Sequence, residues 1–396
     1  MDDGLYRRME RALGGRWDRW MHTIDREDPR SFLQEMVRSL RGDPARDHTG
    51  KRVQNKHRYI GLVPTIAWMQ TSKDPSHPLT YESIATFGRN WDELHPVLSE
   101  QPYHYVSLGV GTGDKDRHIL DRLHAGSGGT TYYMAVDIST SMLNLGTQET
   151  RERMPGRVLL MEMDFEDEDN LEALRAFVAE FAGDEPILYS LLGGSLGNVD
   201  DDALFLRNLA AILRPQDRLV LEVATTARLD EVAVRTVERE RGGNRSYNEF
   251  VTAALAVYTN LTIDTNWLDF SATVVHDAIR VEGVYVNRGN RDIQLMLPNR
   301  EFVPFRVGER IEVLVGRRYT VQRLARLLDE AHLGDAGEEA GLHPIDQRIA
   351  VDRRGFSNLL ILLRYNEIDN AVRSPLQRLW ADNGNISPRF GAGDPR

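Results

Sequence analysis

The chain of 396 residues has no cysteine. Without cysteine it can form no disulfide bond, no zinc site with thiolate ligands and no thiol nucleophile, and nothing else in the sequence requires a metal. The sequence also has no run of about eighteen apolar residues, the length that crosses a membrane, and residues 1–30 lack the apolar centre of a signal peptide. We therefore expect a cytoplasmic, soluble protein with no bound metal and no membrane partner.

The chain also has fewer basic residues than acidic ones. The chain has 49 lysines and arginines against 60 aspartates and glutamates, which gives a formal net charge of −11. Proteins that bind nucleic acids need a basic surface that outweighs long-range repulsion, so we expect no nucleic-acid partner. Only four of the 49 basic residues are lysines. One of them, Lys115, follows a glycine-rich stretch, where a compact ammonium group suits a cofactor; a solvated lysine at a helix start is the alternative interpretation.

The most informative segment is a glycine-rich turn between two apolar runs. The first run, 105–108, leads into Gly109, Gly111 and Gly113, and the second run ends at Asp137. Glycines at alternate positions let the backbone turn sharply and approach a ligand closely, and the next helix offers unpaired N–H groups at its start. An acid at the end of the following strand can bind ribose hydroxyls. The segment therefore predicts the nucleotide-binding corner of a doubly wound α/β enzyme.

The spacing of these glycines distinguishes between cofactors. Gly-x-Gly-x-Gly fits S-adenosylmethionine (SAM) enzymes better than the Gly-x-Gly-x-x-Gly of nicotinamide-dependent dehydrogenases, which would need a glycine where Asp114 stands. SAM is therefore the expected cofactor, and methyl transfer the expected reaction. Asp137 lies 24 residues after Gly113, a separation typical of a ribose-binding acid. A helix N-cap before Ser139 is its alternative role.

Two further strand ends supply candidate site residues. The third strand ends at Asp164 and Phe165, whose carboxylate and ring suit the exocyclic amine and the flat face of adenine; a helix N-cap is an equally good interpretation of Asp164. The fourth strand ends in a glycine-rich turn that contains Gly194 and Ser195 and closes at Asn198. Ligands bind beyond the carboxyl ends of such strands. We therefore expect Gly194 and Ser195 beside the cofactor and Asn198 near the transferred methyl group.

Short apolar strands alternate with amphipathic helices over 103–226, a pattern typical of βαβ units on a parallel sheet. We expect five strands there and a closing hairpin at 347–351 and 359–364. The expected fold is α/β, with a doubly wound, mostly parallel seven-stranded sheet of the SAM-methyltransferase type. The five predicted strands are 105–108, 132–136, 158–163, 187–192 and 218–223.

An inserted α+β substrate domain is predicted after this core. It comprises helices at 230–241 and 247–261 and strand-like runs at 278–286 and 294–297. The aromatic residues scattered over 51–95, among them Tyr59 and Trp68, suit a substrate-facing cap. The predicted division of the chain is a helical N-terminal cap region (1–95) that contributes to the substrate domain, a SAM-binding core (96–226), the insert (227–316), the end of the core (317–366) and a tail (367–396).

Four blocks of the sequence together resemble the histidine-specific SAM methyltransferases of ergothioneine biosynthesis, which trimethylate the α-amine of histidine. The order of parts is similar as well, with a methyltransferase core that is interrupted by a substrate domain and resumes at 317–319. The blocks are LGVGTGDK at 108–115, Asp137, Asp164 with Phe165, and LGGSLGN at 192–198.

The resemblance implies a role for each block. It implies that Lys115 binds the carboxylate of the cofactor, that Asp137 binds its ribose, and that Asp164 and Phe165 bind its adenine. Asn198 would bind the substrate amino acid.

The sequence departs from this family at the substrate. Residues 1–95 have no clear counterpart of the family's N-terminal tyrosine motif, and Leu314 and Gly316 stand where the family has the glutamate and serine that hold the histidine imidazole. We therefore expect a substrate other than histidine, with a larger and less basic side chain. Residues of the insert that can line such a pocket, or pack between helices instead, are Tyr247, Asn248, Tyr258, Asn260 and Trp267.

The expected reaction places few demands on the protein. Methyl transfer is an in-line displacement that needs mainly proximity and alignment. An α-amine with a pKa of about 8 is partly neutral at cellular pH and needs no dedicated base, so we expect Asn198 or the hydroxyl of Tyr247 to orient it. A hydroxyl or carboxylate acceptor would need a nearby acid or histidine, for which His276 and Asp277 are the only pair in the insert.

The leading hypothesis is a SAM-dependent methyltransferase that acts on a small molecule and N-methylates an amino acid or an amino-acid-derived secondary metabolite. One alternative is a degenerate SAM-binding module that acts as a partner or regulatory subunit. Another is a nicotinamide-dependent dehydrogenase, which the glycine spacing disfavours. The sequence leaves the oligomeric state open.

Overall fold

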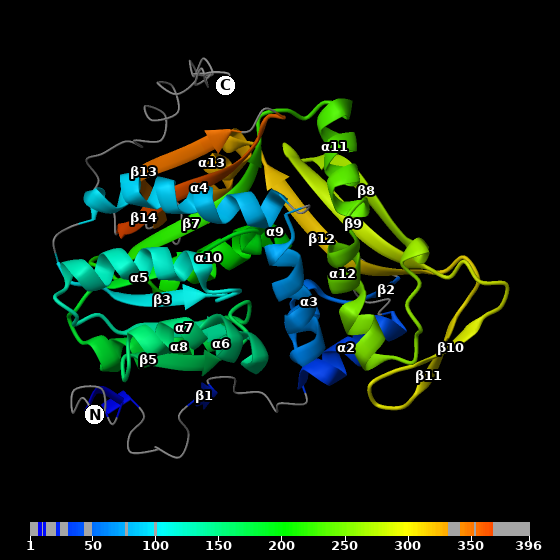
Figure 1. Ribbon diagram of the computed structural model, residues 1–396, viewed down its shortest axis with the longest axis horizontal. Coiled ribbons are helices and arrows are strands. Elements are labelled where there is room, and N and C mark those ends of the chain that lie inside the picture. Colours follow the sequence, from blue (N-terminus) through cyan, green and yellow to red (C-terminus); the bar gives the residue numbers. More distant parts are fainter. Residues whose placement is uncertain are drawn as a thin grey trace.

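The computed structural model describes residues 7–9, 11–12, 21–23, 31–42, 50–75, 78–98, 101–331, 341–351 and 354–366 (Figure 1). The predicted tail, 367–396, lies outside these residues. Within the described ranges, no helix is long and apolar enough to cross a membrane. The same ranges hold no group of three histidine, aspartate or glutamate side chains placed to bind a metal ion.

Five parallel strands form the centre of the fold. They are β3 (His104–Leu108), β4 (Tyr133–Asp137), β5 (Val158–Glu162), β6 (Ile187–Leu191) and β7 (Arg218–Thr226). They pair in the order β5-β4-β3-β6-β7, so the chain proceeds outward from β3 to one side and then returns to its other side. Ligands of such sheets bind where the order reverses, beyond the carboxyl ends of the strands. The fold therefore places a binding crevice at the ends of β3 and β6.

A C-terminal hairpin completes the core sheet. It consists of β13 (Gly341–Val351) and β14 (Phe356–Asn366). β14 lies antiparallel to β7 along the whole length of β7, and antiparallel to β13 on its other side. These seven strands form the doubly wound, mostly parallel sheet that the sequence predicts, and the expected fold class is confirmed.

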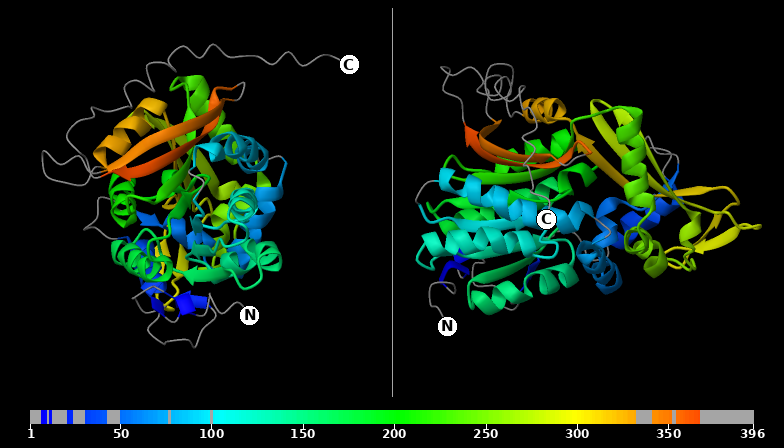
Figure 2. Two further views of the ribbon diagram at one scale, coloured as in Figure 1. Left: turned by 90° about the vertical axis from the view of Figure 1, so that its left-hand side faces the viewer. Right: turned by 45° about the horizontal axis from the view of Figure 1, so that its top comes forward.

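Helices cover both faces of this sheet (Figure 2). They are α4 (Pro78–Leu94), α5 (Asp114–Gly126), α6 (Thr140–Gly146), α7 (Gln148–Arg153), α8 (Glu168–Ala182), α10 (Asp202–Ile212) and α13 (Val321–Glu330). Side chains of α8, α10 and α13 pack against one face, and those of α4, α5 and α6 pack against the other. Because the central strands are buried on both faces, their sequences are continuous apolar runs.

A second lobe extends the sheet beyond β7. The strand of this lobe that lies next to the core sheet is β12 (Arg310–Tyr319), which pairs with β7 only where Tyr319 lies opposite Thr225. It then pairs with β9 (Ala278–Val286), which pairs with β8 (Leu268–Val275), both in antiparallel fashion. The two predicted helices of the insert are present as α11 (Glu231–Gly242) and α12 (Arg245–Tyr258).

Segments before the core join this lobe. Figure 1 shows α2 and α3 beside α12, and α3 packs directly on α12, while β2 pairs with β12. The predicted division into domains stays a prediction. These segments are α2 (Ser31–Arg41), β2 (Lys51–Arg52), η1 (Asn55–Tyr59) and α3 (Leu62–Lys73). The remaining elements are β1 (Met21–Thr23), η2 (His95–Val97), α9 (Ser195–Asn198), η3 (Thr265–Trp267), β10 (Ile293–Met296) and β11 (Phe302–Phe305).

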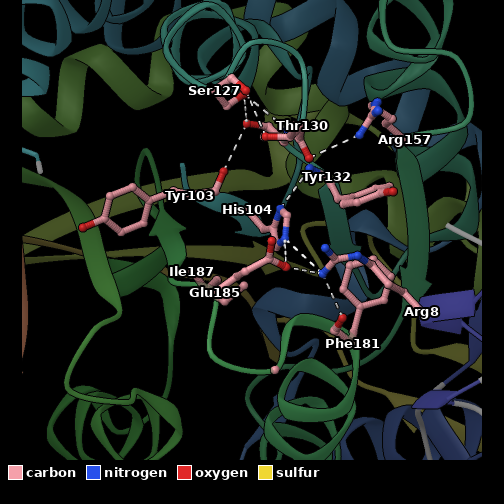
Figure 3. Close-up of polar contacts among 12 residues, drawn as sticks. Arg8, Tyr103, His104, Ser127, Thr130, Tyr132, Arg157, Phe181, Glu185 and Ile187 are labelled. Carbon is pink, nitrogen blue, oxygen red and sulfur yellow. Dashed lines mark hydrogen bonds and ion pairs between the residues drawn. The ribbon is translucent and has the colours of Figure 1, made fainter. Parts of the chain in front are cut away.

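A polar cluster ties residues near the N-terminus to the amino end of β3 (Figure 3). The N–H of Tyr132 donates to Nδ1 of His104 at 3.2 Å, which leaves the imidazole proton on Nε2, 3.1 Å from Glu185. Arg8 donates to the same carboxylate and lies over the rings of Tyr132 and Phe181. Burial lowers the pKa of His104. Protonation of Nδ1 would also break its hydrogen bond with the backbone.

We expect the free energy of unfolding to fall as the pH decreases from about 7.5 to about 5.5. Because the pKa of folded His104 lies below its ordinary value of 6.5, the unfolded chain binds this proton more readily. The stability that His104 contributes is complete above pH 6.5 and is lost below it, by up to about 1.4 kcal/mol per pH unit. Urea unfolding at both pH values should show a smaller loss in His104→Gln than in the native protein. An equal loss in the two proteins would exclude His104 as the titrating group.

Candidate active site

The glycine-rich turn lies beyond the end of β3. Gly109, Gly111 and Gly113 have φ angles of 82°, 53° and 71°, which other residues rarely adopt. The turn also packs without room for side chains, since a Cβ on Gly113 would lie 2.0 Å from the carbonyl oxygen of Gly146 at the end of α6. The turn therefore needs glycine both for its backbone conformation and for its packing.

Asp137 ends β4 beside this turn and is only 6% exposed. Burial raises its pKa to about 7, although hydrogen bonds from the N–H groups of Ser139, Gly111 and Val110 favour the charged form. The N-cap of α6 is Ser139, whose side chain accepts the N–H of Met142. The structure thus gives the capping role to Ser139 and leaves the carboxylate of Asp137 facing the glycine turn.

Lys115 connects the two glycine-rich turns. It lies in the first turn of α5, is largely buried, and places Nζ 2.6 Å from Oε2 of Glu222 in β7. Glu222 is 2% exposed and also accepts the N–H of Gly193, in the turn after β6, at 2.7 Å. Glu222 was missed in the sequence analysis. An acid in the middle of the apolar sequence of β7 is the signal for it, because such an acid is buried only with a partner.

Asp164 and Phe165 follow β5 at the same edge of the sheet. The carboxylate of Asp164 accepts from Nζ of Lys56 at 2.7 Å, while the N-cap of α8 is Asp167. The ring of Phe165 lies 3.6 Å from the place that a Cβ on Gly109 would occupy. Asp164 is therefore not the helix cap, and the ring of Phe165 lies against the glycine turn.

Asn198 is held between the core and the second lobe. It ends α9, where a Cβ on Gly197 would lie 2.6 Å from the carbonyl oxygen of Arg317 in β12. The main-chain oxygen of Asn198 accepts from the amide of Asn55. Asn55 also exchanges hydrogen bonds with the main chain of Val315 in β12. The position of Asn198 is thus set by contacts with two other parts of the chain.

The far end of the crevice is aromatic. The ring centres of Tyr59 and Trp68 lie 5.8 Å apart, and Phe250 lies 5.3 Å from the first and 5.0 Å from the second. Tyr247 is buried beside Phe250. Its hydroxyl accepts from Arg241, whose guanidinium lies 4.8 Å from the centre of the Tyr247 ring. Residues of η1, α3 and α12 thus form one aromatic wall.

One cavity joins the glycine turn to this aromatic wall. Its lining includes Leu314 and Gly316 of β12 and every site residue that the sequence predicts. These predicted residues are Gly109, Gly111, Gly113, Lys115, Asp137, Asp164, Phe165, Gly194, Ser195, Asn198 and Tyr247. The structure therefore brings strand ends of the core and a tyrosine of the second lobe around a single space.

The family model for "Histidine-specific methyltransferase, SAM-dependent" matches residues 66–337 of the chain. The chain belongs to this family. It is a SAM-dependent methyltransferase, an enzyme whose cofactor is SAM, and the prediction from the glycine spacing is confirmed. No curated protein matched the sequence.

Several solved methyltransferase structures match this methyltransferase at low similarity. Magnesium protoporphyrin IX methyltransferase ChlM from Synechocystis PCC 6803 is 10% identical, with 78% of this chain and 97% of that chain covered and a TM-score of 0.38. The CcbJ methyltransferase from Streptomyces caelestis is 14% identical, with 70% and 89% covered and a TM-score of 0.34. The glycopeptide N-methyltransferase MtfA is 15% identical, with 69% and 84% covered and a TM-score of 0.33. Such distant matches say nothing about the acceptor.

The aromatic end of the cavity contains residues that the sequence analysis did not assign to the site. Asn55, Arg58 and Arg241 line the cavity, and no local pattern marks them. Tyr59 and Trp68 line it too, in agreement with the substrate-facing cap that their segment predicts. Leu314 is 2% exposed, so an apolar side chain stands where the family resemblance places an acid.

Other residues considered for the pocket lie elsewhere and have structural contacts. Tyr258 donates to the carbonyl oxygen of Ile60 at 3.0 Å, and Asn260 bonds to the main chain of the β10 segment. Asn248 and Trp267 do not line the cavity. His276 and Asp277 form an exposed turn between β8 and β9, where Asp277 pairs with Arg326.

Replacement of Gly113 by alanine should abolish binding of S-adenosylhomocysteine (SAH) and lower the melting temperature strongly. The new Cβ would meet the carbonyl oxygen of Gly146, and the positive φ adds roughly 1–2 kcal/mol of backbone strain. Gly128→Ala is the matched control, because Gly128 has a φ of 61° but nothing within 4 Å of its Cβ position. Thermal unfolding and SAH titration of both variants measure the difference. Equal losses in the two variants would contradict the packing argument.

Proposed function

We propose that this methyltransferase N-methylates a small molecule, an amino acid or an amino-acid-derived metabolite. The observation that carries the proposal is the cavity that joins the glycine turn to an acceptor end formed by η1, α3, α12 and β12. Among the described residues that these elements contribute to the lining, none is a histidine, aspartate or glutamate. A partly neutral amine needs no such base, whereas a hydroxyl does.

The other end of the cavity fits SAM. The N–H groups of Gly111 and Val110 bond to Asp137 at the glycine turn, and hydroxyl donors would stabilise this buried carboxylate further. We propose that Asp137 binds the ribose, that Asp164 and Phe165 bind the adenine, and that Gly194 and Ser195 lie beside the cofactor. SAM supplies an electrophilic methyl group on its sulfonium.

Lys115 is proposed to bind the carboxylate of the cofactor's amino-acid tail. An ammonium group has three donors, and Glu222 accepts one of them. The ring of Phe87, 5.6 Å from Nζ, covers another side of the group. In this arrangement Glu222 fixes Lys115 beside the glycine turn, which supports a cofactor role rather than a solvated lysine.

Asn198 and Tyr247 are proposed to orient the acceptor amine. Each is held by a neighbour, Asn198 by Asn55 and Tyr247 by Arg241. An in-line displacement depends on the alignment of the nucleophile. A neutral amine can donate to the side-chain carbonyl of Asn198 and keep its lone pair directed toward the methyl group.

Calorimetric titration with SAH and with NAD, followed by a screen of SAM consumption over amino acids and amines, tests the proposal. SAH binding, no NAD binding and turnover on an amine are the expected results. Turnover only on hydroxyl or carboxylate acceptors would contradict N-methylation. SAH binding without any turnover would favour the degenerate SAM-binding module.

The substitution Asp137→Asn should weaken SAH binding by roughly 10- to 100-fold, because hydrogen bonds to a charged acceptor are worth about 1.5–3 kcal/mol. The matched control is Asp201→Asn. Asp201 is the N-cap of α10, a role that asparagine performs equally well, and it does not line the cavity. Calorimetry of both variants gives the comparison. Unchanged affinity in Asp137→Asn would refute the ribose site.

SAH affinity should rise with pH between about 6 and 8. The pKa of Asp137 in the free protein is about 7, and ribose hydroxyls that donate to it favour its charged form. Below this pKa binding must release a proton, so affinity falls by up to about tenfold per pH unit. In Asp137→Asn the dependence should disappear. A slope that persists in this variant would assign the titration to another group.

A further inference from the structure

The acceptor end contains a buried arginine, Arg58, to which no described residue supplies an acidic partner. Arg58 is 1% exposed and lines the cavity. Its Nε and Nη2 donate to the main-chain and side-chain oxygens of Asn55, at 3.3 and 2.8 Å. Its guanidinium lies 5.8 Å from the ring centre of Tyr59 and 5.5 Å from that of Phe250. Within the described part of the chain, no carboxylate stands at ion-pair distance from it.

Four other cationic side chains of the same cavity have carboxylate neighbours. Their pairs are Lys56 with Asp164, Lys115 with Glu222, Arg317 with Asp202, and Arg318 with Glu240. Arg58 differs from all four of these cations. It therefore contributes a positive charge that no described acidic side chain neutralises in its immediate surroundings.

A buried charge without a counter-charge is unfavourable by several kcal/mol. The guanidinium has five N–H donors, of which Asn55 takes two. Around it stand the aromatic rings of Tyr59 and Phe250, and the apolar Leu314 lines the same space. An anion that enters this space would meet fixed donors in a medium where water screens little, which strengthens the ion pair.

We propose that Arg58 binds a carboxylate or other acidic group of the acceptor, so that the substrate is an acidic amine whose flat, apolar body packs against Tyr59, Trp68 and Phe250. This inference rests on the proposed function and specifies its substrate class. In a site for histidine, an acidic residue of the protein would hold the basic imidazole of the substrate. In the proposed site the protein supplies the cation, Arg58, and the apolar Leu314 stands in the place of the acid.

Calorimetry of the SAH-loaded protein with benzoate and with benzamide tests the proposal. The two probes share a ring and differ in charge. We expect the native protein to bind benzoate roughly tenfold more tightly than benzamide or better, and Arg58→Gln to bind both equally. The matched control is Arg317→Gln. Arg317 also lines the cavity but donates to the main-chain oxygens of Val199 and Asp200, so this variant should keep the preference.

The ratio of the affinities for benzoate and benzamide distinguishes an anion-binding role of Arg58 from a purely structural one. If Arg58 only supports the aromatic rings, its replacement will weaken both probes alike, and the proposal fails. If Arg58→Gln does not fold, Arg58→Met, which also removes the charge but keeps a long unbranched side chain, decides: a lost preference for benzoate supports the proposal, and an unchanged one overturns it. Native protein that binds SAH and methylates amines but shows no preference for benzoate refutes this inference alone. If the native protein does not bind SAH at all, the proposed function is refuted instead.

Discussion

The active site depends on a difference in length between two neighbouring strands. The pairing of β6 with β7 ends where Leu191 lies opposite Leu221, whereas β7 continues to Thr226. The edge of β7 that β6 leaves open is taken by β12 at Thr225. The turn after β6 must therefore pass close to β12, and only glycine at position 197 permits this approach. For this reason Asn198 stands at the junction of the core and the second lobe.

The sequence predicts the cofactor half of the molecule well because its signals are local. Each central strand is a short apolar run, and each candidate residue follows such a run directly, so the sheet topology alone brings Gly109, Asp137 and Asp164 to one edge. Local sequence did not decide between a site role and a helix cap. The structure shows that Ser139 and Asp167 are the caps. The helices α6 and α8 therefore begin a few residues after Asp137 and Asp164, and neither acid is needed as a cap.

The acceptor half is less predictable because its contacts are long-range. Arg58 and Tyr59 lie in a 3₁₀ turn without periodicity, and their aromatic neighbour Phe250 is about 190 residues away in the chain. The strands β8 and β11 were also missed, because both are partly exposed, polar residues interrupt β8, and β11 is only four residues long and contains a proline. Glu222 shows the same limit. Its sequence context indicates a partner, but only the fold, which brings the first turn of α5 beside β7, identifies Lys115 as that partner.

One hydrogen-bond network links the proposed acceptor site to the turn that ends at Asn198. Asn55 bonds with Arg58 through its side-chain oxygen, with Val315 in β12, and with the main-chain oxygen of Asn198. The distance between the cation that would hold an acidic group and the amide that would orient an amine is therefore fixed by a single side chain. Because methyl transfer depends on alignment, this fixed separation favours acceptors whose acid and amine lie a set distance apart. Substitutions in η1 and β12 can then change the acceptor while the glycine turn and Asp137 retain the cofactor.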